Sequence, residues 1–183
     1  MAKVVAICGM PGSGKGIFSE TAKKLGIPVR SMGDMIRSEV ISRGLPEDPH
    51  IFGKIAQELR NELGDGFLAA RLAPAINSEL GESELVVIEG MRGVAERDIF
   101  VDYWGNNFSI LAITSEMETR FQRIISRGRS EDGDRESFDI RDEREIGWGL
   151  DELINGADEF IENNGTMDEF IESCNKLLKE LSA

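Results

Sequence analysis

The residues best suited to chemistry in this sequence form a glycine-rich stretch that contains a lysine. Residues 9–16 read Gly-Met-Pro-Gly-Ser-Gly-Lys-Gly and match the spacing G-x-x-x-x-G-K of a phosphate-binding loop. Glycines allow successive main-chain N–H groups to converge on one phosphate, and the lysine can reach the β- and γ-phosphates. We therefore expect ATP to be bound by Gly9, Met10, Pro11, Gly12, Ser13, Gly14, Lys15 and Gly16.

The residue after Lys15 departs from this pattern. Loops of this kind usually carry a serine or threonine there as a magnesium ligand, but this chain has Gly16. The Mg²⁺ of Mg-ATP would then be held mainly through water and by carboxylates from elsewhere in the chain. Glu89, which follows the apolar run 85–88, is the first candidate, and Asp34 is the second.

Arginine is concentrated in one segment of the chain. Seven of the 14 arginines lie between residues 120 and 144, where there is no lysine. A guanidinium presents a planar fork of donors that suits phosphate oxygens, so the segment indicates a local anion to be bound. The other interpretation is a solvated helix whose arginines pair with neighbouring acids.

These residues need a scaffold, and the hydrophobic pattern predicts alternating strands and helices. Apolar runs near 4–8, 27–30, 85–88, 108–113 and 160–161 indicate short strands. Helices are expected near 16–25, 33–43, 51–63, 66–79, 94–103 and 135–146, and from residues 115 and 166 onward. Such alternation predicts an α/β fold with a parallel five-stranded sheet and helices on both faces.

The helix that begins near residue 115 is predicted to have two different faces. The apolar face, expected to pack against the sheet, consists of Met117, Phe121, Ile124 and Ile125. The adjacent stripe carries Arg120, Arg123 and Arg127. Ser115 and Thr166 are each followed three residues later by glutamate, which predicts a capping box at the start of two helices.

The composition is that of a soluble globular protein in one domain: 183 residues, 40% hydrophobic and 30% charged. No apolar run approaches the roughly 18 residues of a membrane span, and no signal peptide is evident, so we expect a cytoplasmic protein without a membrane partner. The net charge of −13 argues against general nucleic-acid binding. Cys8 and Cys174 lie in apolar patterns and are expected in the core.

Three segments resemble adenylate kinase. The loop at 9–16 is similar to that enzyme's loop, including the proline and the glycine after lysine. Residues 31–37, Ser-Met-Gly-Asp-Met-Ile-Arg, resemble its acceptor-binding segment S-T-G-D-M-L-R, and residues 89–92, Glu-Gly-Met-Arg, resemble D-G-F-P-R with one residue fewer. Residues 157–166 resemble the segment of dephospho-CoA kinase that passes the adenine of ATP. As a whole, the chain is similar to a mainly archaeal group of predicted P-loop nucleotide kinases.

The resemblance implies a three-layer P-loop NTPase fold of the nucleoside monophosphate kinase type, over residues 1–183. A helical acceptor-binding insertion would lie at about 33–80 and a lid at about 127–146. The acceptor would be bound by Ser31, Gly33, Asp34, Arg37 and Arg92. ATP would also contact Arg120, Asn163, Asn164 and Gly165. The catalytic residues would be Lys15, Arg92, Arg127, Arg129, Arg141 and Arg144, with Glu89 and Asp34 orienting hydrated magnesium.

The favoured function is a kinase that moves the γ-phosphate of Mg-ATP to a small nucleotide-type acceptor. A nucleoside monophosphate is the first choice of acceptor and dephospho-CoA the second. Residues 45–84 match neither enzyme clearly, and the hydroxyl after Lys15 is missing. These two features leave open an ATPase switch that acts on a protein or ribonucleoprotein partner. A nucleotide sensor without turnover is a third hypothesis.

Overall fold

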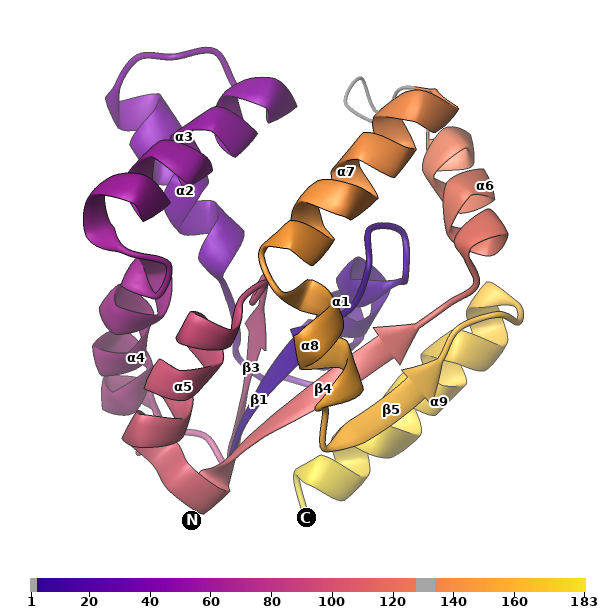
Figure 1. Cartoon of the computed structure of the whole chain (residues 1–183). Coiled ribbons are helices and arrows are strands. Elements are labelled where there is room, and N and C mark those ends of the chain that lie inside the picture. The colour runs from indigo at the N-terminus through magenta and orange to yellow at the C-terminus, as the bar shows by residue number, and fades with distance from the viewer. Residues whose placement is uncertain (1–2, 128–133) are drawn as a thin grey trace.

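The structure, a computed structural model, describes residues 3–127 and 134–183 and contains a parallel sheet covered by helices (Figure 1). The strands are β1 (Lys3–Cys8), β2 (Val29–Ser31), β3 (Leu85–Glu89), β4 (Phe108–Thr114) and β5 (Glu159–Glu162). Their order in the sheet is β2-β3-β1-β4-β5, and every neighbouring pair is parallel. The predicted five-stranded α/β fold is therefore confirmed.

The helices in the described residues lie close to their predicted positions. They are α1 (Lys15–Lys24), α2 (Met32–Ser42), α3 (Pro49–Leu63), α4 (Phe67–Glu79), α5 (Val94–Trp104), α6 (Met117–Arg127), α7 (Arg135–Gly147), α8 (Leu150–Asn155) and α9 (Met167–Leu181), with a 3₁₀ turn at Gly105–Asn107. Helix α8 was not predicted. It has only six residues between Gly149 and Gly156, too few to show a helical hydrophobic period.

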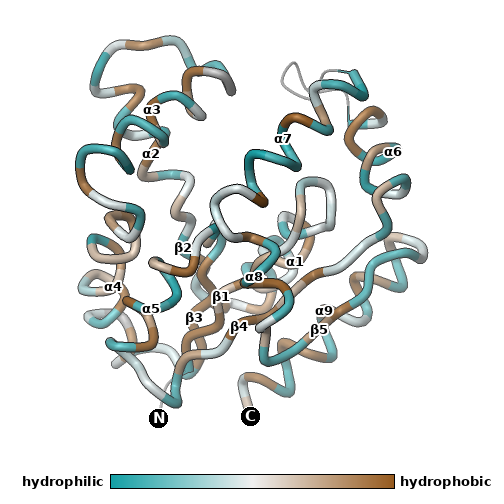
Figure 2. Tube along the Cα trace, in the orientation of Figure 1, coloured by the Kyte–Doolittle hydropathy of each residue, from teal (hydrophilic) through white to brown (hydrophobic). Residues whose placement is uncertain are grey.

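Strand β1 has a buried side chain at every position from Val4 to Cys8. Val5 and Ile7 face the layer of α1 and α9, whereas Val4, Ala6 and Cys8 face the layer that contains α4, α5 and α8. The hydropathy colouring of Figure 2 shows this apolar centre along the strands. Two-sided burial explains why β1 reads as a continuous apolar run without alternation.

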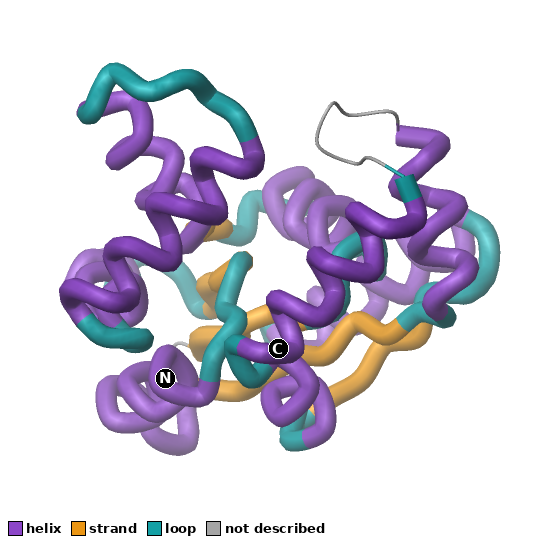
Figure 3. The backbone as a smooth tube through the Cα atoms, turned by 45° about the horizontal axis from the view of Figure 1, so that its top comes forward, coloured by secondary structure: helices purple, strands orange, loops and turns teal. Residues whose placement is uncertain are grey.

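Two helical arms extend beyond the carboxyl ends of the strands (Figures 1 and 3). Helices α2 and α3 form one arm and α6 and α7 the other, and the loop after β1 lies at the base of the second arm. The arms meet at Trp148: its Nε1 donates to Gln57 Oε1 at 3.0 Å, and the Arg60 guanidinium lies 4.7 Å from its ring centroid. After β1 the chain continues to β2 on one side of β1, and after β3 it continues to β4 on the other side. Ligands of such sheets bind in the crevice where the direction changes in this way.

The prediction for the faces of α6 was right for Ile124, which is 2% exposed, and wrong for three other residues. Met117 is 52% exposed and Ile125 48% exposed, whereas Arg120 is only 4% exposed. Helix α6 lies against the loop after β1, where a Cβ on Gly12 would come within 2.9 Å of the Arg120 carbonyl and 3.1 Å of Ile124. Because that contact is with polar main chain, the helix buries an arginine beside one isoleucine.

The two predicted capping boxes had different outcomes. The Thr166 box is present: its hydroxyl accepts from Glu169 N, and the Glu169 carboxylate accepts from Thr166 N. Ser115 does not begin α6, which starts at Met117. The Ser115 hydroxyl instead donates to the Asn163 carbonyl at 2.7 Å, a partner about 50 residues away that no local pattern could indicate.

Cys8 and Cys174 are both fully buried and are not joined in a disulfide, as predicted. Burial raises the pKa of each thiol to about 12. None of the helices in the described residues is long and apolar enough to span a bilayer.

Helix α8 provides a test of the core. Leu153 has no exposed surface and lies in the apolar layer with α5, so Leu153→Ala should lower the free energy of unfolding by about 2–5 kcal/mol in urea titration. Leu63→Ala is the matched control, because Leu63 is 49% exposed and the same change should cost about 1 kcal/mol or less. Equal losses for the two variants would contradict the packing described.

Candidate phosphate-binding site

The loop between β1 and α1 adopts a conformation that only glycine allows at several positions. Gly9, Gly12 and Gly14 have φ angles of 152°, 80° and 115°. At Gly14 a Cβ would also lie 2.5 Å from Asn163 Nδ2 and 2.9 Å from the Phe170 ring. Helix α1 begins directly after Gly14, so the unpaired N–H groups of its first turn lie at the loop and provide a site for an anion.

Asn163, at the end of β5, supports this loop from below. It is 3% exposed, and its Nδ2 donates to the Ser13 carbonyl at 2.8 Å. Arg123 fixes Asn163 in turn, through bonds to its carbonyl at 2.9 Å and its Oδ1 at 3.1 Å. Of the predicted segment 163–165, Asn163 thus contacts the loop, whereas the Asn164 side chain accepts from Glu116 N at 2.8 Å and Gly165 lies beside Glu169. The side chain of Asn163 is used to brace the loop.

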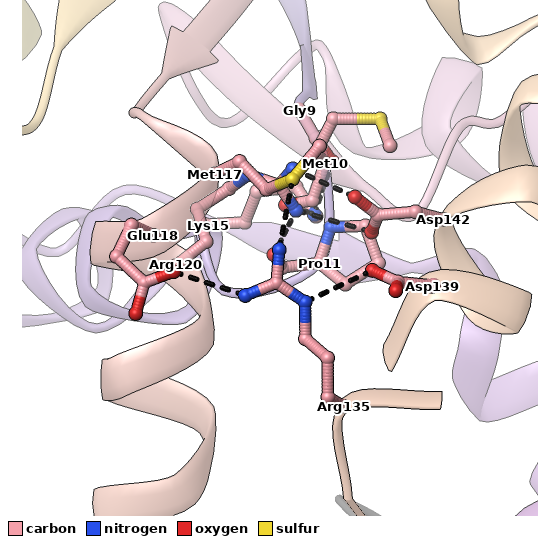
Figure 4. A network of polar contacts seen from close by, with 10 residues as sticks. All are labelled: Gly9, Met10, Pro11, Lys15, Met117, Glu118, Arg120, Arg135, Asp139 and Asp142. Atoms are coloured by element: carbon pink, nitrogen blue, oxygen red, sulfur yellow. Dashed lines mark hydrogen bonds and ion pairs between the residues drawn. The ribbon is translucent and has the colours of Figure 1, made fainter. Parts of the chain in front are cut away.

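Arg120 ties the same loop to α7 (Figure 4). Its guanidinium forms two bonds to the Asp142 carboxylate, at 3.0 and 2.7 Å, and a third to the Pro11 carbonyl at 3.0 Å. Arg120 and Asp142 are both buried. Arg120 is thus paired with an acid, as in the ion-pair interpretation of the arginine segment, but the pair lies in the interior and not on a solvated helix face. Arg135 similarly joins the start of α7 to Glu118 of α6, at 2.9 Å.

Lys15 is folded back onto its own loop. Its Nζ donates to the carbonyls of Gly9 and Met10. Burial lowers the pKa of Lys15 to about 8; Glu145 opposes this shift, and the positive charges of Arg92 and Arg141 add to it. The lysine is therefore still mostly protonated at neutral pH, and it belongs to an electrostatic cluster with residues far away in the sequence.

The centre of that cluster is Glu145, which the sequence analysis did not identify. Its carboxylate lies 3.4 Å from Arg92 Nε and 3.5 Å from Arg141 Nε. Arg92 comes from the turn after β3 and Arg141 from α7, so two of the predicted catalytic arginines are brought together beside Lys15. Arg144 projects from the same helix, with its guanidinium 5.4 Å from the Trp148 ring centroid and close to Gly53 of α3.

A second buried glutamate fixes the main chain at Arg92. Glu96 has no exposed surface and accepts bonds from Arg92 N at 2.7 Å and Gly93 N at 3.2 Å. Its other oxygen accepts from Arg60 Nη2 at 3.1 Å, which attaches α3 to this turn. Burial raises the pKa of Glu96, although these donors oppose the shift. Arg92 is thus held by Glu96 at its main chain and by Glu145 at its guanidinium.

Glu89, the first predicted magnesium ligand, has a hydroxyl partner. Ser19 Oγ donates to Glu89 Oε2 at 2.6 Å. Ser19 lies one helical turn after Gly16, so a serine three positions beyond the usual site was the available sequence signal. Among the described side chains, Ser13 Oγ in the loop is buried without any hydrogen-bond partner. Such an atom is expected where a polar ligand completes the site.

The predicted acceptor residues are less concentrated. Ser31 pairs with Glu89 in the β2–β3 register, so it does reach the carboxyl end of β3. Gly33 follows in α2, close to Gly90. Asp34 and Arg37 are 69% and 57% exposed and form a loose pair at 3.6 Å. They therefore lie outside the buried cluster.

The remaining two predicted catalytic arginines are Arg127 and Arg129. Arg127 ends α6 on the surface, and Arg129 lies outside the described residues.

A cavity of about 400 Å³ opens between the two arms, next to Arg92. It is lined by Gln57, Arg60, Asp65, Gly93, Arg144, Gly147 and Trp148. Another, of about 360 Å³, lies between the segment before β3 and the end of α9, away from the cluster. The first is lined by Gly93 and Arg144, which adjoin Arg92 and Glu145 in the chain, so of these two cavities it is the one relevant to chemistry.

Comparison with known proteins gives consistent results. Residues 8–141 match the AAA domain family. The UPF0200 protein of Methanosarcina mazei is 44% identical over 93% of this chain and 90% of its own length. The UPF0200/UPF0201 protein of Archaeoglobus fulgidus is 41% identical over 98% of this chain, which spans only 56% of that relative.

Two solved structures show the same fold. The dephospho-CoA kinase of Campylobacter jejuni has a TM-score of 0.59 at 18% identity, covering 99% of this chain and 98% of its own. TT1252 from Thermus thermophilus has a TM-score of 0.58 at 20% identity, covering 100% of this chain and 99% of its own. At these identities the likeness establishes the fold alone.

The lowered pKa of Lys15 predicts a pH dependence of ATP binding. A phosphate beside Lys15 would raise that pKa above about 8, so binding requires the protonated lysine and takes up a proton when the pH is near or above 8. The affinity should be highest below about pH 8 and roughly tenfold lower near pH 9 than near pH 7. Calorimetry would measure this, with Lys15→Ala as the control that loses the dependence. An affinity that rises with pH would contradict the assignment.

Proposed function

Because this chain belongs to the AAA domain family of P-loop proteins and to the archaeal UPF0200 group, we propose that it is an ATP-dependent nucleotide kinase. The observation that carries the proposal is the meeting of Lys15, Arg92 and Arg141 around one buried carboxylate. These cations come from the loop after β1, from the turn after β3 and from α7, which belongs to the arm formed by α6 and α7. Positive charge from three directions suits two phosphate-bearing substrates placed in line, which is the main requirement of phosphoryl transfer.

In the proposed reaction, the loop 9–16 and Lys15 bind the phosphates of ATP, and Arg141 and Arg144 approach from α7. Arg92 binds the acceptor. The bond between the γ-phosphorus and the β–γ bridging oxygen breaks, a bond from that phosphorus to an acceptor oxygen forms, and ADP leaves. The arginines stabilise the charge that spreads over the equatorial oxygens.

The favoured acceptor is a nucleoside monophosphate, with dephospho-CoA second. The attacking phosphate oxygen of a nucleoside monophosphate is already ionised at neutral pH, so this acceptor needs cations and positioning and requires no general base, whereas the attacking hydroxyl of dephospho-CoA would have to lose a proton. Arg92 supplies a cation, and the cavity of about 400 Å³ beside it falls in the usual size range of small-molecule sites. We also propose a cytoplasmic location.

Magnesium would be held by Glu89 through water, and the residues present fit this role. Ser19 engages one oxygen of Glu89 and orients the carboxylate, which compensates for the missing hydroxyl after Lys15. Asp34 is so exposed that it could only assist from a distance through water. When bound, the ion supplies charge neutralisation at the β- and γ-phosphates.

A panel of acceptors tests the activity. ADP formation from Mg-ATP is measured with AMP, CMP, UMP, GMP, dTMP and dephospho-CoA, and mass spectrometry identifies any product. We expect one acceptor to stimulate ADP formation strongly and to appear in phosphorylated form. Lys15→Ala is the blank, and its loss of rate should be on the order of 10³-fold or more.

The alternative functions give different results in the same assay. Slow hydrolysis that no small acceptor stimulates would refute the kinase and favour an ATPase switch that acts on a protein or ribonucleoprotein. Tight ATP binding without any turnover would favour a sensor.

The magnesium site has a test that does not depend on turnover. Glu89→Gln and Ser19→Ala should leave metal-free ATP binding within about twofold, while weakening the added affinity that Mg²⁺ confers by about 10- to 100-fold. Calorimetric titrations with and without Mg²⁺ measure the difference. Thr21→Val is the matched control, since the Thr21 hydroxyl on the same helix donates to the Ile17 carbonyl and not to Glu89. An unchanged magnesium effect in Glu89→Gln would remove Glu89 from this role.

A further inference from the structure

Glu145 is a buried acid that has no role in the phosphoryl transfer proposed above. It lies in the last turns of α7 and is 2% exposed. A buried carboxylate at a phosphate site is unfavourable in two ways. Its desolvation costs folding free energy, and its negative charge repels a negatively charged substrate. Its presence in such a place therefore requires a reason.

The contacts of Glu145 show what the charge does while no ligand is bound. Its Oε2 faces Arg92 Nε at 3.4 Å and its Oε1 faces Arg141 Nε at 3.5 Å, so each oxygen serves one guanidinium. Arg92 belongs to the turn after β3 and Arg141 to α7, and both are 31% exposed. Without an anion between them, these two cations and Lys15 would repel one another and turn outward to water.

The balance of charges keeps Glu145 ionised. Burial by itself would raise its pKa, but Arg92, Lys15, Arg141 and Arg144 outweigh burial and hold the pKa below its ordinary value. A full negative charge thus sits among the cations that we propose bind phosphate. A carboxylate and a phosphate oxygen present the same kind of acceptor to a guanidinium, so the two compete for one set of donors.

We propose that Glu145 is a positioning residue that serves as the internal counter-ion of the phosphate site. It holds Arg92 and Arg141 in place until substrate phosphates take over their guanidiniums, that of ATP at Arg141 and that of the acceptor at Arg92. The protein then keeps its cations ordered when empty. The consequence is weaker nucleotide binding, because every phosphate that binds must displace an existing ion pair. This inference rests on the proposed function in placing ATP phosphates at the loop and the acceptor at Arg92; the ATP-binding test below depends on the first placement alone.

Removing the charge of Glu145 should therefore have two opposite effects. In Glu145→Gln, the ligand-free protein loses an anion that binds two arginines and should unfold at a lower temperature. The same variant should bind ATP about tenfold more tightly, since the phosphates no longer compete with a carboxylate. The probe is ATP without metal, measured by calorimetry, together with the rise in unfolding temperature that ATP produces, which should be larger than in the wild type.

Glu143→Gln is the matched control. Glu143 lies on the same helix, two residues away, and is exposed. The Glu143→Gln variant removes the same charge from the protein as Glu145→Gln. Because salt screens the charge of an exposed side chain, its ATP affinity should stay within about twofold of the wild type. Glu145→Asp keeps the charge but shortens the side chain, so it should span the two arginines poorly and bind ATP more tightly by a smaller factor. That variant keeps the inference testable if Glu145→Gln does not fold.

Weaker or unchanged ATP binding in these Glu145 variants would overturn the inference and make Glu145 an ordinary structural support. Tightening of equal size in Glu143→Gln would overturn it as well, because the effect would then be one of net charge. Failure of the kinase proposal looks different: wild-type protein would bind ATP but phosphorylate no acceptor, while the order of affinities among the variants would remain.

Discussion

The loop after β1 can bind a phosphate only if its main chain stays in a conformation that is unfavourable for most residues, and much of the structure serves that requirement. Glycines with positive φ make the conformation accessible. Asn163 holds the loop through the Ser13 carbonyl, and Arg120 holds it through the Pro11 carbonyl. These two braces come from β5 and α6, and each is itself fixed by a further ion pair or hydrogen bond. A loop supported in this way does not need to be ordered by its ligand, which favours tight and rapid binding.

Buried acids organise the arginines of this protein. Asp142 fixes Arg120, Glu96 fixes Arg60 and the main chain at Arg92, and Glu145 fixes the guanidinium of Arg92. A guanidinium removed from water needs such a partner, because its desolvation is otherwise uncompensated. An acidic chain with a net charge of −13 can therefore present a local positive site. The acids that make the average negative are in part the groups that hold the cations in position.

The two arms differ in how much the sequence revealed of them. The arm formed by α6 and α7 was recognised by the seven arginines of its segment, yet the sequence could not tell which of them face the crevice and which brace the loop. Arg120, which was expected to contact ATP, and Arg123, on the same stripe, brace the loop. Arg141 reaches the cluster because α7 returns beside the turn at Arg92. The arm formed by α2 and α3 contributes Arg60 and Gln57, which both contact Trp148 and which no motif identified.

By itself, the sequence determined the order of the strands and of the helices other than α8, the parallel α/β class, the glycine-rich loop and the helix cap at Thr166. Each of these depends on residues that are close together in the chain: an apolar run, a glycine spacing, a cap three residues from its partner. The tertiary structure decided which arginines meet Lys15, that Glu145 lies among them, that Ser19 supports Glu89, and that Ser115 binds Asn163 instead of capping α6. These contacts join segments separated by many residues, so they follow from the way the elements pack, which local patterns do not specify.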